Sequence, residues 1–187
     1  MKKNLAISIL MTLVTTVLLG LIYPLVMTAV SQALFSDKAN GQLIVRNGKV
    51  IGSRIIGQPF TGPGYFHSRP SAAGLGYDAA NSAGTNLAPT NQKLVDRVKQ
   101  DTATLQAENT SARVPIDLVT TSASGLDPDI TPAAAYFQVP RIALERRMSQ
   151  DDVMSLVQTQ IQRRQIGFLG EPRVNVLELN LALDARK

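Results

Sequence analysis

The longest uncharged stretch of the chain lies at its N-terminus, between Lys3 and Asp37. Apolar residues predominate over positions 5–30, more than the roughly 20 residues that a helix needs to cross a bilayer core. The pattern predicts a single transmembrane anchor helix over residues 1–35 and one mixed α+β domain over residues 36–187.

A cleaved signal peptide is the alternative interpretation, with Lys2 and Lys3 as its basic region. The apolar character continues past a normal signal core, and residues 29–33 do not form a convincing cleavage site. We therefore expect a retained helix. Pro24, directly after Tyr23, predicts a kink or an interfacial bend near its far end.

The flanking charges predict the orientation of this helix. Lys2, Lys3 and the amino terminus precede it, whereas the first charges after it are Asp37 and Lys38. Positive charge stays preferentially on the cytoplasmic side, so we expect a cytoplasmic N-terminus and residues 36–187 outside. The absence of cysteine agrees weakly with an extracytoplasmic domain.

Short-range patterns predict the elements of the domain. Asn47-Gly48 between the apolar runs 43–46 and 49–51 indicates a β-hairpin, because both residues accept positive φ. A helix is expected over 90–107, capped by Thr90, followed by a strand over 116–120. A second helix should begin at Thr131-Pro132, with a kink or restart near Val139 before Pro140. A third helix is expected from Ser149 to about Gly167, and a final strand over 174–183 with its leucines buried. Helices and strands do not alternate strictly, which favours the α+β class.

Residues 57–91 are expected to form a long ordered loop. This segment holds six of the 13 glycines, four of the 10 prolines and four of the nine Phe and Tyr residues, but only two charged residues. A loop so rich in aromatic residues is more often ordered and functional than disordered. Two interpretations stay open: an irregular part of the core and a partner-binding surface.

Charge and size exclude some functions. Without the first 30 residues the chain has 17 basic and 14 acidic residues, a net charge of +3, with no basic run interleaved with aromatics. This is too mild for nucleic-acid binding. The remaining length of about 150 residues suits one domain with its own core.

Candidate catalytic chemistry is sparse. The single histidine, His67, combines on paper with Ser68, Ser71 or Ser122 and with Asp78 or Asp127. No Gly-x-Ser-x-Gly elbow supports such a triad, so a hydrogen-bonded structural histidine is favoured. Asp127 and Asp129 do not complete a calcium loop; Asp127 capping a turn is the simpler interpretation, and a transient cation contact at either carboxylate stays open. No phosphate-cradling Gly-rich loop occurs.

Several segments together resemble the C subunit of the bacterial Kdp potassium-transporting P-type ATPase. They include Gly64-Tyr65-Phe66-His67-Ser68-Arg69-Pro70-Ser71-Ala72, together with residues 52–58, 77–78, 86–91, 114–120, 122–127, 170–177 and 180–184. The resemblance covers essentially the whole chain, including the helix with Tyr23-Pro24. A small departure occurs at Ala83-Gly84-Thr85, where the family often has Gly-Gly-Ser.

The resemblance implies a non-catalytic accessory subunit of an ATP-driven potassium importer in the bacterial inner membrane. The implied partners are a channel-like ion-conducting subunit, a P-type ATP-hydrolysing subunit and a small single-helix subunit. The family subunit is described as assembling the complex and as a catalytic chaperone that raises the ATP affinity of the hydrolysing subunit. This chain has no Asp-Lys-Thr-Gly-Thr phosphorylation motif, and ATP and potassium are expected to be handled by the complex rather than by a cofactor site of this chain.

The predicted orientation conflicts with direct ATP contact, because the domain lies outside the membrane. We therefore expect the domain to dock over the entrance of the ion-conducting subunit, and any effect on ATP affinity to be allosteric. The expected partner contacts are Tyr65, Phe66, His67, Arg69 and Asp127, and alanine at Tyr65 or Phe66 is expected to weaken association more than folding. A stand-alone anchored envelope binding module and an anchored hydrolase are the alternative functions.

Overall fold

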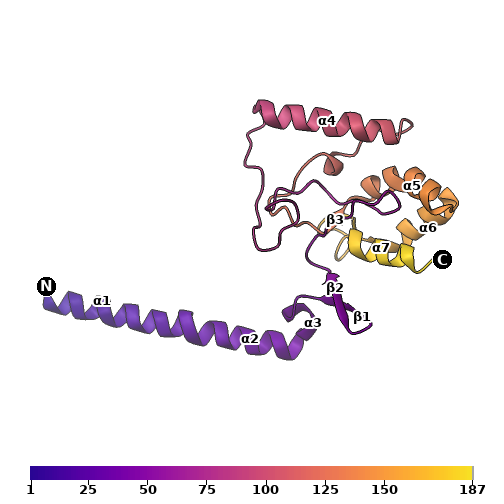
Figure 1. The fold of residues 1–187 in the computed structure, drawn as a ribbon. Coiled ribbons are helices and arrows are strands. Elements are labelled where there is room, and N and C mark those ends of the chain that lie inside the picture. The colour runs from indigo at the N-terminus through magenta and orange to yellow at the C-terminus, as the bar shows by residue number, and fades with distance from the viewer. Residues whose placement is uncertain (187) are drawn as a thin grey trace. The chain divides into compact units, whose positions relative to one another are not determined.

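A computed structural model describes residues 1–186. The chain divides into two compact units, Met1–Ile51 and Gly52–Lys187, which are described separately below. Helices and short strands are mixed, and one long apolar helix precedes the domain (Figure 1). The expected α+β class is confirmed.

The first unit begins with a helical run, Lys2–Leu34, that is long and apolar enough to cross a membrane. It consists of α1 (Lys2–Thr15), a π-helical segment (Thr16–Ile22) and α2 (Tyr23–Leu34). Pro24 lacks the N–H that would close an ordinary helical turn, and the wider π turns lie directly before it. The helical run continues through Pro24, and the kink or interfacial bend expected there stays a prediction.

The same unit ends in a short helix and a hairpin. α3 (Ser36–Ala39) is followed by β1 (Leu43–Arg46) and β2 (Lys49–Ser53), which pair in a two-stranded sheet. Asn47 and Gly48 connect them with φ of 52° and 74°, the positive values that a tight hairpin turn requires. The hairpin prediction is confirmed.

The second unit contains the remaining elements. In chain order they are α4 (Gln92–Glu108), the 3₁₀ helix η2 (Ile116–Leu118), β3 (Asp129–Ile130), α5 (Pro132–Arg146), α6 (Gln150–Gln160), β4 (Ile161–Gln162), β5 (Arg173–Asn175) and α7 (Val176–Asp184). The strands form an antiparallel sheet of order β3-β5-β4, in which Val174 pairs with Ile130 on one side and Ile161 on the other. Figure 1 shows α4 apart from the group formed by α5, α6 and α7.

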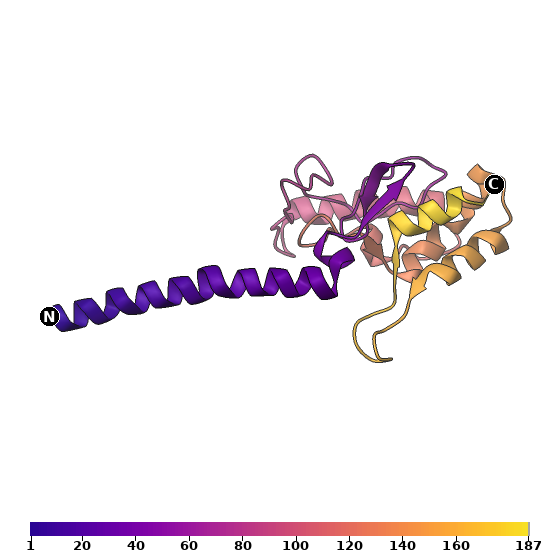
Figure 2. The ribbon, with the colours of Figure 1, turned by 90° about the horizontal axis from the view of Figure 1, so that it is seen from below.

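The loop between β4 and β5 projects from the second unit, as Figure 2 shows. The sequence predicts a helix up to about Gly167, but α6 ends at Gln160 and the chain enters the sheet at Ile161. The start of α6 is as predicted, because the Ser149 hydroxyl accepts a hydrogen bond from the Asp152 N–H at 3.1 Å.

Helix α5 passes through Pro140 without ending. Thr131 caps it as predicted, accepting from the Ala134 N–H at 3.1 Å, and Pro132 occupies its first turn. The restart expected near Val139 is wrong, since the helix runs as one element to Arg146. Val139 and Ile142 on either side of the proline are buried, and this burial offsets the roughly 3 kcal/mol that an internal proline costs.

The end of the chain differs most from the sequence prediction. Only Arg173–Asn175 form a strand, and the expected strand over 174–183 becomes helix α7. Asn175 caps this helix, accepting from the Glu178 N–H at 3.1 Å. Alternation of leucines suggested a strand, but the buried positions Val176, Leu177, Leu179, Asn180 and Leu183 follow a helical period.

Two other predictions are also corrected. The strand expected over 116–120 is the 3₁₀ helix η2, in which the Leu118 and Val119 N–H groups bond three residues back. Helix α4 forms as expected, but its cap is Asn91 rather than Thr90, with the Lys93 N–H at 2.9 Å from the Asn91 Oδ1.

The hydrophobic core lies in the second unit. It comprises Phe66, Leu118, Ile130, Ala134, Ala135, Phe137, Val139, Ile142, Ala143, Val153, Leu156, Val157, Val174, Val176, Leu179 and Leu183. Most of these residues belong to α5, α6, β5 and α7, whereas Phe66 comes from the long loop 57–91. This loop is therefore anchored in the core through an aromatic side chain.

Candidate functional site

The segment 63–69, here called the strap, carries four of the five residues expected to contact a partner. It has no strand partner, so its backbone groups bond to side chains of α5 and α7 instead. Asn180 of α7 accepts from the Phe66 N–H and donates to the Phe66 carbonyl, both at 2.9 Å. Gln138 of α5 accepts from the His67 N–H at 2.7 Å and donates to the His67 carbonyl at 3.1 Å.

Both amides are buried, with 1% of Asn180 and 3% of Gln138 exposed. A buried amide that lies between apolar neighbours must find partners, because an unpaired polar group is costly in the interior. Here each amide satisfies one backbone N–H and one carbonyl of the strap. The two amides therefore replace the ladder that a β-sheet would have supplied.

Two arginines bind the first half of the strap. Arg141 donates from Nη1 to the carbonyls of Pro63 and Tyr65, and Arg146 donates from Nε to the Gly64 carbonyl at 2.8 Å. Arg141 also pairs with Glu108 of α4, with its Nε 3.2 Å from Oε2. Burial lowers the pKa of the Arg141 guanidinium, and this carboxylate opposes the shift.

Tyr65 is half-buried between a cation and an aromatic ring. The Arg146 guanidinium lies 4.5 Å from its ring centroid, and Phe60 lies 5.7 Å away on a tilted plane. The Tyr65 hydroxyl donates to Asp184 Oδ2 at 3.3 Å, and Asp184 also pairs with Arg146 at 2.8 Å. Part of the Tyr65 side chain thus remains at the surface, where a partner can reach it.

The next two strap residues differ in accessibility. Phe66 is 0% exposed and belongs to the core, so its side chain is not available to a partner in this fold. His67 is half-buried, and its Nε2 lies 2.9 Å from the Gly62 carbonyl oxygen. Because a carbonyl only accepts, Nε2 carries the proton. Burial lowers the pKa of His67, which favours the neutral ring.

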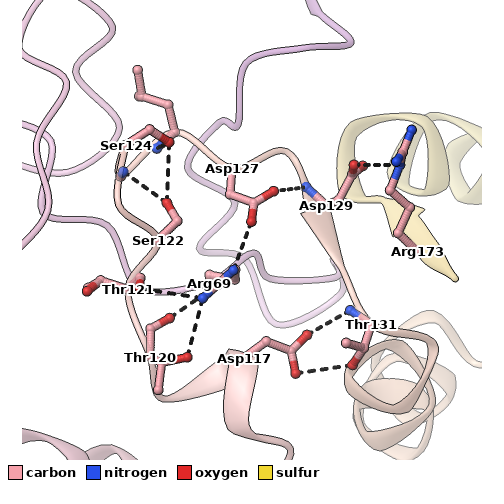
Figure 3. Close-up of polar contacts among 12 residues, drawn as sticks. Arg69, Asp117, Thr120, Thr121, Ser122, Ser124, Asp127, Asp129, Thr131 and Arg173 are labelled. Atoms are coloured by element: carbon pink, nitrogen blue, oxygen red, sulfur yellow. Dashed lines mark hydrogen bonds and ion pairs between the residues drawn. The ribbon is translucent and has the colours of Figure 1, made fainter. Parts of the chain in front are cut away.

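Arg69 joins the end of the strap to the loop before β3, as Figure 3 shows. Its Nη1 is 2.9 Å from Asp127 Oδ2, and its remaining donors lie 3.3–3.4 Å from the backbone oxygens of Thr120 and Thr121. Asp127 Oδ1 in turn accepts from the Asp129 N–H at 3.0 Å. The structure therefore brings Arg69 and Asp127, 58 residues apart in sequence, into direct contact.

A hollow of about 290 Å³ lies beside this ion pair, lined by Arg69, Asp117, Asp127, Asp129, Ile130, Thr131, Glu171, Pro172 and Arg173. Asp117 accepts from the Thr131 N–H at 2.7 Å and from its hydroxyl at 3.1 Å, and so binds the N-terminus of α5. Asp129 pairs with Arg173 at 2.9 Å (Figure 3). Burial raises the pKa of Asp129, with Arg173 opposing the shift.

These contacts define what the hollow can do chemically. Asp117, Asp127 and Asp129 each accept from groups of the same domain, so a cation would have to displace a built-in partner. Within residues 1–186 no group of three His, Cys, Asp or Glu side chains is placed to hold a metal ion. The observed network fixes loops to helices.

The triad that can be written from the sequence is not assembled around His67. Ser71 Oγ donates to the Gly125 carbonyl at 2.6 Å, and Ser122 Oγ accepts from the Gly125 N–H at 2.9 Å. Asp78 accepts a hydrogen bond from the Asn81 side-chain amide at 2.6 Å. The His67 ring bonds to a backbone carbonyl instead.

Sequence reasoning missed the residues that position the strap: Asn180, Gln138, Arg141 and Arg146. It also missed Asp117, which binds the N-terminus of α5. The signal for Asn180 was a lone amide at a buried position of a leucine-rich segment, which becomes visible only with a helical period. Gln138 occupies a similar place in α5. Neither position indicates its distant backbone partner without the fold.

Comparisons with known proteins identify relatives along almost the entire chain. A family model described as K+-transporting ATPase, c chain (KdpC), matches residues 5–185. A potassium-transporting ATPase KdpC subunit of Koribacter versatilis is 68% identical over 184 residues, which is 98% of this chain and 95% of the relative. The KdpC subunits of Acidobacterium capsulatum and Rhodopseudomonas palustris are 59% and 55% identical, and each alignment covers at least 97% of both chains.

Proposed function

Because this chain belongs to the KdpC family, the c chains of K+-transporting ATPases, we propose that it is a membrane-anchored, non-catalytic subunit that assembles and stabilises a potassium-importing ATPase complex. Its proposed partners are the channel-like ion-conducting subunit, the ATP-hydrolysing P-type subunit and a small single-helix subunit. The proposed location is the bacterial inner membrane.

The helical run Lys2–Leu34 is the observation that carries this proposal. None of its most apolar window is buried by the rest of the chain, although its mean hydropathy is 2.5. Exposed apolar surface of this extent requires lipid or the helices of other subunits as its surroundings. Small and hydroxyl-bearing positions such as Gly20 and Thr16 allow close approach of a neighbouring helix.

A non-catalytic role of the domain is supported by the way its polar side chains are used. Asn180 and Gln138 hold the strap, while Arg69 and Asp127 hold the loop before β3. These groups stabilise a defined surface, of which half-buried Tyr65 and His67 form part. We place this surface over the entrance of the ion-conducting subunit. Any increase in the ATP affinity of the hydrolysing subunit would then be an allosteric coupling of about 1–3 kcal/mol.

Co-purification tests the assembly role. A C-terminally tagged chain, extracted from membranes in mild detergent, is expected to carry larger membrane subunits with it, identified by mass spectrometry. As a matched control, residues 1–35 are replaced by an unrelated single-span helix of equal length. This chimaera should remain in the membrane and retain much less of the partner subunits. A native chain that migrates alone would instead support a stand-alone binding module.

Protease accessibility tests the orientation. Lys2 and Lys3 should hold the N-terminus in the cytoplasm, because positive flanking charge resists translocation. Protease added outside spheroplasts is therefore expected to digest residues 36–187, whereas the same domain should be protected in inverted membrane vesicles. The reverse pattern would place the domain in the cytoplasm, where it could contact ATP directly.

A further inference from the structure

The loop of residues 163–172, between β4 and β5, exposes a cluster of large apolar side chains at its tip. Ile166 is 81% exposed, Phe168 68% and Leu169 48%. The loop projects from the second unit (Figure 2), so these side chains are not covered by its core. An exposed apolar cluster of this kind is typical of a surface that contacts another apolar phase.

The conformation of this tip is fixed, and it is strained. Gln165 and Leu169 exchange two backbone hydrogen bonds of 2.9 Å each, which close the loop. Ile166 within it has φ of 54°, a value that a β-branched residue rarely adopts. This strained backbone directs the Ile166 side chain into solvent, where the side chain gains no packing inside this domain. Backbone strain of this kind clusters at functional sites, so the outlier at Ile166 marks the tip as a candidate contact surface.

Basic residues lie at the base of the loop. Arg164 pairs with Glu171 at 2.5 Å and Arg173 pairs with Asp129, whereas Arg163 makes no ion pair with any residue that the structure describes. Beside the loop is an open hollow of about 580 Å³ lined by Pro132, Ile161, Arg163, Arg164, Gly167 and Pro172. Because Glu171 already pairs with Arg164, Arg163 is the guanidinium at this hollow that suits an anionic phosphate group.

We propose that the 163–172 loop docks on the surface of the bilayer. Ile166, Phe168 and Leu169 enter the boundary between headgroups and acyl chains, while Arg163 binds the phosphate of an anionic lipid. A loop with apolar residues at its tip and basic residues where it leaves the domain has the composition that binds anionic membrane interfaces. The proposal rests on the anchoring proposed above. Residues 35–51 connect the anchor helix to the domain and span roughly 60 Å at most, so the domain stays near the membrane.

Single labels can test this docking because the chain contains no cysteine. An environment-sensitive fluorophore is attached to F168C at the tip, to V17C within the apolar helix, or to A103C on the exposed face of α4. The full chain is reconstituted into phosphatidylcholine vesicles containing phosphatidylglycerol and spin-labelled lipid. The label at position 168 should shift to the blue and be quenched several-fold more than the label at position 103.

Removing the charge of Arg163 tests the contact with the lipid headgroup. R163A in the F168C background should reduce quenching in phosphatidylglycerol vesicles and have little effect in pure phosphatidylcholine. The control K99A alters an exposed lysine of α4 and should change neither.

The alternative outcomes separate the loop from the anchor. If the label at position 17 is quenched but the label at position 168 is quenched no more than the label at position 103, the docking is overturned and the anchoring stays intact. No quenching at position 17 would overturn both. A shift at position 168 that appears only after partner subunits are added would assign the loop to a protein contact and overturn the lipid proposal.

Discussion

Replacing Phe66 by alanine should unfold the domain rather than weaken a contact with a partner. Phe66 is 0% exposed and is part of the core between α5, α6 and α7. Removing a buried phenyl ring leaves a cavity, and such changes typically cost about 3–5 kcal/mol. Denaturant titration of the full chain in detergent, followed by far-UV circular dichroism, measures the loss in the free energy of unfolding.

The neighbouring residue provides the comparison. Tyr65→Ala removes the contacts with Arg146 and Phe60, but the side chain is only half-buried, so the loss should be about 1–2 kcal/mol. Phe66→Leu, which refills most of the space, should also be much milder than Phe66→Ala. If Phe66→Ala kept wild-type stability and lost only the partner subunits, Phe66 would return to the interaction surface.

Replacing Asn180 by leucine should be nearly as destabilising. The Asn180 amide satisfies both the N–H and the carbonyl of Phe66, and it is 1% exposed. Leucine has a similar size but leaves both backbone groups buried without partners, at about 1–3 kcal/mol each. The expected loss is on the order of 2–6 kcal/mol in the free energy of unfolding, measured by the same titration. The strap should also become more sensitive to protease.

A matched amide provides the control for this substitution. Gln138→Leu removes the two equivalent hydrogen bonds to the His67 backbone and should also destabilise the domain strongly. Gln158→Leu, on the exposed face of α6, should change the free energy of unfolding by no more than about 0.5 kcal/mol. Equal and small effects at Asn180, Gln138 and Gln158 would show that the amides do not hold the strap.

Local elements with strong short-range signals could be predicted from the sequence. Asn47-Gly48 specified the hairpin because both residues adopt positive φ, and Thr131-Pro132 and Ser149 specified the starts of α5 and α6. The strand predicted over 116–120 and the strand predicted from alternation over 174–183 were both wrong. A short apolar run fits both a strand and a helix, and only burial against other elements decides between them.

The candidate site was predictable in part. The aromatic-rich loop 57–91 was recognised as ordered, and its interpretation as part of the core is confirmed for Phe66. Tyr65 and His67 are half-buried, and their contact with a partner stays a prediction. The pairing of Arg69 with Asp127 and the bonds of Asn180 and Gln138 to the strap were not predictable. These contacts join segments from 58 to 114 residues apart, and local sequence carries no information about such partners.

The sequence by itself determined the apolar N-terminal helix, the α+β class and the family, because these depend on composition, local periodicity and residue identity along the chain. Only the tertiary structure decided which aromatic residues are buried, which polar groups hold loops in place and which apolar side chains stay exposed. Those outcomes depend on burial, since the cost of an unpaired polar group or an uncovered apolar one is set by the neighbours that folding brings together.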